Sequence, residues 1–263
     1  GGTDIADDRA IEEAAAGEDP NQPKSALEWL DQAVAYDANS VEARLARAQL
    51  CRQMAGVPGA EEAQSQQLME RAVRDLTAVD AAEPNNPRLL YAVGTEWMLH
   101  GRLDRAEAEL QAIEALSAET MREHFLDPND WNVARFLYVA ELAKERADAE
   151  GGAALADTAL EPLTEARHRL EVLPTAIDLY LDADRVEDAN DCVSEFVEIF
   201  SASEDGDESP LQPAWYQARV AMARGKPYEV MNTLEPVVKS HSADAQIWLF
   251  WDLLADAYDR TRQ

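Results

Sequence analysis

The sequence predicts an all-α protein in which antiparallel helix pairs stack in a row, an architecture known as an α-solenoid. Three observations point to this fold class. One helical packing pattern recurs six times, and a second pattern precedes several of its copies. The composition also disfavours β structure, with only 11 Gly, 12 Pro and 7% aromatic residues among 263. Sandwiches and barrels need many turns and many strand-forming side chains.

The first pattern is a small residue, then an aliphatic residue four positions on and an apolar residue three further. These spacings place the three side chains on one helix face, and the small residue lets a neighbouring helix approach closely. The six copies are Ala26-Leu30-Ala33, Ala72-Leu76-Val79, Ala106-Leu110-Ile113, Ala159-Leu163-Ala166, Ala189-Val193-Phe196 and Val230-Leu234-Val237. They predict the second helix of each pair.

The second pattern predicts first helices and lies upstream of several of these copies. It reads Leu90-x-x-Val93-Gly94-x-x-Trp97 and returns as Trp251-x-x-Leu254-Ala255-x-x-Tyr258. The run Glu83-Pro84-Asn85-Asn86-Pro87 predicts the end of one helix and the start of the next, because Pro and Asn punctuate helices.

At these residues the chain resembles the tetratricopeptide repeat family, whose unit is a helix-turn-helix of about 34 residues. Residues 87–118 fit a whole unit without an insertion, and the resemblance extends over about residues 20–263, in five to six helix pairs. It implies a right-handed superhelix with a concave groove lined by first helices. It also implies a role in binding peptides or other proteins.

The departures from the repeat predict the domain organisation, with a solenoid over 20–263 interrupted near 52–64, 117–127, 142–157 and 201–210. Residues 1–19 predict a short acidic helix, with the first helix of an incomplete unit as one interpretation. The insertion near 142–157 contains Gly151-Gly152, and the acidic segment at 201–210 predicts a solvated linker. Pro162 and Pro236 predict either a bend within a second helix or a helix start.

The charge of the chain excludes several classes of partner. Its 52 acidic and 23 basic residues give a net charge of −29. Nucleic acids and anionic membrane surfaces both require a basic patch, which the sequence lacks. No apolar run reaches the roughly 20 residues of a membrane helix, so we expect no membrane insertion by this fragment. The chain begins Gly1-Gly2, and both a cytoplasmic location and export after loss of a signal or anchor stay open.

The sequence offers no constellation typical of catalysis, so we expect a protein without enzymatic activity or cofactor. It has no glycine-rich phosphate loop and no nucleophile elbow. A zinc site needs three or four converging ligands, and the scattered histidines predict none. These are His100, His124, His168 and His241.

The repeat phase selects side chains that would face the concave groove. They are Tyr91, Thr95, Met98, Phe136, Val139, Trp215, Arg219 and Met222. An apolar and aromatic band of this kind suits an amphipathic segment, and the acidic exterior favours a basic partner. The alternative is that an inserted loop such as 142–157 covers the band and makes it core.

The final helix predicts a second surface, because no helix follows to cover it. Trp248, Leu249 and Phe250 are the candidates for self-association, for a joint to a further unit, or for a simple truncation effect. The leading functional hypothesis is therefore a non-enzymatic scaffold that binds a protein or peptide. An oligomerisation or spacer segment of a longer multidomain protein is the second, and an unrecognised enzyme or metal-binding protein is the third.

Overall fold

The computed structural model describes residues 25–57, 61–124, 127–202, 211–241 and 247–261, and within these ranges every regular element is a helix. The predicted all-α class is thus confirmed. The chain divides into two compact units, Gly1–Ala115 and Leu116–Gln263, which are described separately below.

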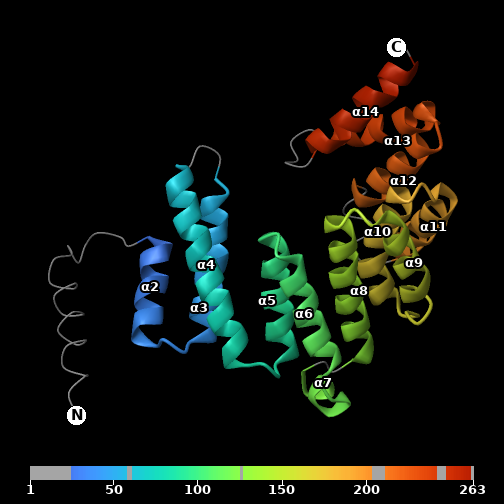
Figure 1. The fold of residues 1–263 in the computed structure, drawn as a ribbon. Coiled ribbons are helices and arrows are strands. Elements are labelled where there is room, and N and C mark those ends of the chain that lie inside the picture. The colour runs from blue at the N-terminus through green and yellow to red at the C-terminus, as the bar shows by residue number, and fades with distance from the viewer. Residues whose placement is uncertain (1–24, 58–60, 125–126, 203–210, 242–246, 262–263) are drawn as a thin grey trace, which may run out of the picture. The chain divides into compact units, whose positions relative to one another are not determined.

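The first unit contains five described helices, which run up and down in sequence order (Figure 1). They are α2 (Ala26–Tyr36), α3 (Val41–Ala55), α4 (Glu62–Ala82), α5 (Pro87–Leu99) and α6 (Leu103–Glu114). The pairs α3–α4 and α5–α6 make the largest packing contacts. Asn86 accepts a hydrogen bond from the backbone N–H of Leu89, and Pro87 occupies the first turn of α5. Both features are helix-start signals, so the predicted boundary before Pro87 is correct.

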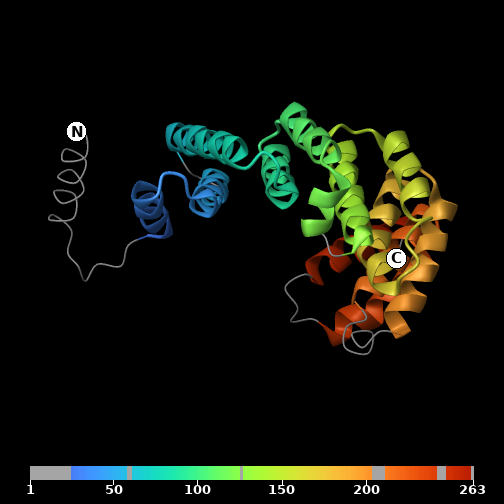
Figure 2. The ribbon, with the colours of Figure 1, turned by 90° about the horizontal axis from the view of Figure 1, so that it is seen from below.

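The described residues of the second unit form eight helices. Figures 1 and 2 show them from two sides. They are α7 (Ala118–His124), α8 (Pro128–Glu145), α9 (Ala149–Ala159), α10 (Ala166–Asp182), α11 (Val186–Ala202), α12 (Leu211–Ala223), α13 (Pro227–Ser240) and α14 (Ile247–Thr261). Helices α8, α10 and α12 each pair with the helix that follows them, and α14 packs on α13. In addition, α10 contacts both α8 and α12, so alternate helices form a continuous row.

The connection between α9 and α10 corrects one repeat match. The predicted helical triplet Ala159-Leu163-Ala166 spans the end of α9, a non-helical segment and the start of α10. Pro162 lies in that segment and therefore neither bends a helix nor starts one, whereas Pro236 does lie inside α13. Leu163 is still buried in the core, at 2% exposure. The spacing identified a core residue but assigned it to the wrong element.

Residues 142–157 are the end of α8 and most of α9, and the expected inserted loop is wrong. Asp148 caps α9 by accepting a hydrogen bond from the backbone N–H of Gly151 at 3.0 Å. A Cβ on Gly152 would lie 2.8 Å from Cδ2 of Leu179, which belongs to α10. The two glycines therefore serve helix capping and close helix packing rather than a loop.

The remaining departures from the repeat are placed in part. Helix α3 ends at Ala55 and α4 begins at Glu62, and the segment 117–127 contains the short helix α7. The predicted acidic helix at 1–19 lies outside the described residues. Of the predicted linker at 201–210, residues 201–202 are the end of α11 and 203–210 lie outside the described residues.

Candidate functional site

A cavity of about 480 Å³ opens on the row of alternate helices in the second unit. Its walls come from the end of α8, the connection to α9, the first residue of α9, the C-terminal end of α10 and Arg219 of α12. The lining residues are Ala143, Lys144, Ala147, Asp148, Ala149, Asp178, Leu179, Asp182 and Arg219.

An ion cluster centred on Asp178 gives this cavity its chemistry. Lys144 Nζ lies 3.4 Å from Asp178 Oδ2, and the Arg219 guanidinium donates to Asp178 Oδ1. Each of these three side chains keeps about 30% of its surface exposed. The guanidinium carbon of Arg219 lies 5.8 Å from the centre of the Trp215 ring. Asp178 thus pairs with two cations at the cavity, and one of them, Arg219, also lies over an aromatic ring.

The selected groove residues of the second unit fall into two groups. Arg219 lines the cavity, while Trp215 and Val139 are half-buried on the same row of helices. Phe136 and Met222 are buried, with 1% and 7% exposure, and belong to the core. The expectation that these two face an open groove is therefore wrong. Phe136 belongs to the same core cluster as Ala153 and Ala156 of α9, which is a helix and not the inserted loop of the alternative.

The selected residues of the first unit lie on α5. Tyr91 and Thr95 are half-buried, and burial raises the pKa of the Tyr91 hydroxyl. Met98 is buried at 4% exposure, so it too is a core residue rather than a groove residue. These side chains belong to a different unit from those around Asp178.

The last helix exposes two tryptophans. Trp248 is 58% exposed, whereas Leu249 is half-buried and Phe250 packs against Trp215 with 5.3 Å between ring centroids. Trp251, which the repeat pattern treats as a packing anchor, is 52% exposed. The self-association hypothesis therefore retains Trp248, loses Phe250 and gains Trp251.

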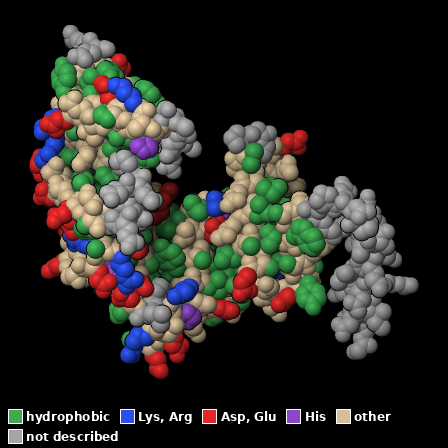
Figure 3. Space-filling view, turned by 180° about the vertical axis from the view of Figure 1, so that it is seen from behind, with side chains coloured by type: hydrophobic (Ala, Val, Ile, Leu, Met, Phe, Trp, Pro, Cys, Tyr) green, Lys and Arg blue, Asp and Glu red, His purple; other side chains and the backbone are tan. Residues whose placement is uncertain are grey.

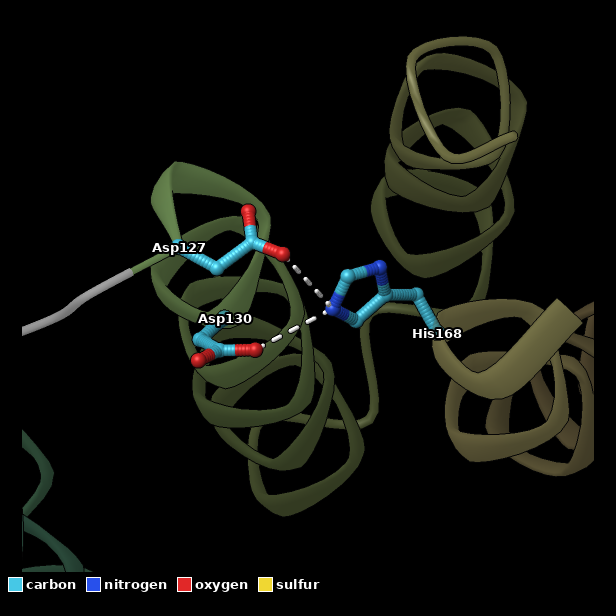
Figure 4. Close-up of side chains that lie close together, drawn as sticks. All are labelled: Asp127, Asp130 and His168. Carbon is cyan, nitrogen blue, oxygen red and sulfur yellow. Dashed lines mark hydrogen bonds and ion pairs between the residues drawn. The ribbon is translucent and has the colours of Figure 1, made fainter. Parts of the chain in front are cut away.

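A second cluster, which the sequence analysis missed, joins α8 to α10 (Figure 4). The His168 ring is buried with 1% exposure and directs Nε2 toward two carboxylates at the start of α8. Nε2 lies 3.1 Å from Asp130 Oδ1 and 3.8 Å from Asp127 Oδ2. The only available signal was the spacing of the two aspartates, which places both in one helical turn. Nothing in the sequence links them to a histidine on another helix.

The charges around this cluster are unequal. Arg167 donates to Asp127 and Glu165, and its Nη2 lies 3.7 Å from Asp130 Oδ1. The pKa of Asp127 lies below its usual value, chiefly because the backbone N–H of Asn129 donates to the carboxylate. Asp127 is therefore ionised at neutral pH. Three carboxylates, counting Glu165, surround one guanidinium and one imidazole.

Comparison with known proteins adds no assignment. No protein-family model matches the sequence, and no curated protein is significantly similar to it. Among the described helices, none combines the length and apolar character that crossing a bilayer requires.

Proposed function

We propose that the protein is a non-enzymatic scaffold of the tetratricopeptide type that binds a protein or peptide segment at the Asp178 cavity. The observation that carries this proposal is the cavity itself, which opens on the row formed by α8, α10 and α12. The sequence resemblance implies that first helices line the binding surface, and these three helices are the first members of their pairs. The proposed binding surface is therefore the one that the resemblance predicts, the face lined by first helices.

The lining defines the kind of segment that fits. Asp182 is exposed and has no ion-pair partner among the described residues, so it is available to a basic side chain. The half-buried Trp215, next to Arg219, offers apolar surface. Lys144 and Arg219 can donate to backbone carbonyl groups of a bound peptide. An amphipathic segment with at least one basic side chain satisfies all of these groups.

The charge of the whole protein would assist the encounter. Acidic and basic side chains lie next to one another on the second unit (Figure 3), as in the pairs Arg185–Asp157 and Arg224–Glu187. Such pairs leave the net charge unchanged, and the excess of acidic residues over basic ones makes it −29. A basic partner is therefore attracted over a distance of about one Debye length, roughly 10 Å at 0.1 M salt.

The test is a peptide-display selection on the full chain, followed by affinity measurements with the selected peptides. We expect the double variant Arg219→Gln/Asp182→Asn to bind at least about tenfold more weakly, a loss of about 1.4 kcal/mol, because it removes two charged contacts to the proposed peptide at once. Arg224→Gln changes an arginine at the end of the same helix, away from the cavity, and should leave affinity unchanged. Equal affinity of all three proteins would refute the cavity as the binding site.

The exposed tryptophans favour one alternative function, an oligomerisation or spacer segment. Trp248 and Trp251 are three residues apart on α14 and more than half exposed. Exposing two neighbouring large apolar side chains to water is unfavourable, and such patches often mark contacts with another protein. Light scattering of the full chain distinguishes the two functions. A mass that stays monomeric as concentration rises would exclude self-association through α14.

A further inference from the structure

The atoms of the His168 cluster are already spaced like the ligands of a metal ion. One ligand atom from each of His168, Asp127 and Asp130 lies within 4.8 Å of the other two. In a tetrahedral zinc site with bonds of about 2.0–2.2 Å, neighbouring ligand atoms lie about 3.3–3.6 Å apart. The two measured separations from Nε2, 3.1 and 3.8 Å, bracket that range. Side-chain adjustments of a few tenths of an ångström would bring these two ligand pairs to the required spacing.

The environment of the imidazole matches that of a metal-bound histidine. The ring of His168 is almost fully buried, and its second nitrogen, Nδ1, has no hydrogen-bond partner among the residues that the structure describes. The nearest carboxylate oxygen to Nδ1 is Glu165 Oε2, at 3.9 Å. Histidines that ligate a metal through one nitrogen generally donate the N–H of the other to a carboxylate or carbonyl group. A metal on Nε2 would fix the proton on Nδ1, and Glu165 is placed to accept it after a small side-chain movement.

The charge balance also favours a cation. Asp127, Asp130 and Glu165 carry three negative charges, and Arg167 supplies one positive charge. The Arg167 side chain is 57% exposed, so it can turn into solvent without leaving a buried charge behind. Arg167 and a bound cation would therefore compete for the carboxylates of Asp127 and Asp130.

We propose that His168, Asp127 and Asp130 bind a divalent transition-metal ion of the zinc class, which ties α8 to α10 within the second unit. One imidazole and two carboxylates suit zinc, whereas Mg²⁺ and Ca²⁺ prefer six or more oxygen ligands. The three side chains leave one tetrahedral position for water. The inference is independent of the Asp178 cavity, since none of its residues lines that cavity.

The experiment titrates ZnCl₂ into the full chain by calorimetry after chelator treatment, with MgCl₂ in a parallel titration. We expect one equivalent of zinc to bind and magnesium to bind far more weakly. Asp130→Asn should weaken zinc binding by at least about tenfold, since one of three protein ligands is lost. Arg167→Gln should tighten it, because the competing guanidinium is gone. Zinc should also raise the melting temperature of the wild type but not of Asp130→Asn.

Glu198→Gln provides the matched control, because it removes one exposed carboxylate from α11 and none from the cluster. The Asp130 side chain is partly exposed, so we expect the asparagine of Asp130→Asn to fit without disturbing the fold. Circular dichroism checks that each variant remains folded. Three results would overturn the proposal: no zinc binding by the wild type, equal weakening by Asp130→Asn and Glu198→Gln, or magnesium binding as tight as zinc binding. The last two would assign the signal to the acidic surface as a whole.

Discussion

Replacing Asp75 with alanine should lower the free energy of unfolding of the first unit by about 3–5 kcal/mol, the range for breaking a buried ion pair. Asp75 lies on α4 with 2% exposure. Its Oδ1 accepts from Arg44 at 3.0 Å and from Arg47 at 2.7 Å, and its Oδ2 accepts from Arg47 Nε at 2.7 Å. The Arg47 side chain is only 11% exposed. In the variant its one remaining partner is Asp31, at 3.0 Å, so the guanidinium is poorly solvated and only partly compensated.

Urea unfolding followed by circular dichroism measures this effect, and two further variants interpret it. Asp75→Asn should cost less than Asp75→Ala, because an amide oxygen still accepts from one arginine. The triple variant Arg44→Leu/Arg47→Met/Asp75→Leu should recover much of the loss, since it removes the stranded charges together with their partner. A triple variant as unstable as Asp75→Ala would contradict this explanation and assign the loss to packing.

The sequence predicted the structure best where local signals and packing agree. Residues 87–118 carry a helix-start signal, a first-helix pattern and a second-helix pattern in the right order. The structure places α5 and α6 there, with Val93 and Ala106 at 0% exposure. Each local preference points to the same helix pair, so no distant contact was needed to predict it.

Prediction failed where a local signal opposed a packing requirement. Gly151-Gly152 is a turn signal in isolation, yet α9 needs a glycine to approach Leu179. The repeat phase likewise identified the inward or outward face of a helix without showing what covers it. Phe136 and Arg219 were selected by the same rule, and only Arg219 retains an exposed surface.

Ion pairs between distant residues could not be predicted for a different reason. The chain has 52 acidic residues, so every arginine has many potential partners in the sequence. Arg47 meets Asp75 across 28 positions, and His168 meets Asp130 across 38. Whether two such residues meet in space depends on how the helices stack. A repeat pattern predicts which helices pair but not which of their side chains come into contact. The buried charges of this protein are therefore a property of its tertiary structure.

Glu109 is the clearest titratable group in the core. It lies on α6 with 4% exposure, and burial together with the nearby Asp80 carboxylate raises its pKa to about 7 from an ordinary value of 4.5. Arg105 and the Trp97 indole N–H act in the opposite direction. The indole N–H lies near the carboxyl group but does not reach hydrogen-bond geometry. The charged form of Glu109 is therefore poorly compensated in the folded protein.

The first unit should lose stability as pH rises from about 4.5 to about 7, and Glu109→Gln should remove that component of the loss. Between these values the folded state holds a proton that the unfolded state has released, so the free energy of unfolding falls with pH. Well above pH 7 the penalty is complete, about 3 kcal/mol for a shift of this size. Glu109→Gln should thus be more stable than the wild type at pH 8 and nearly equal to it at pH 4.

Urea unfolding across this pH range measures the difference in the free energy of unfolding. The control is Glu114→Gln, which replaces an exposed glutamate on the same helix. A Glu109→Gln variant that tracks the wild type at every pH would show that Glu109 ionises normally in the folded protein.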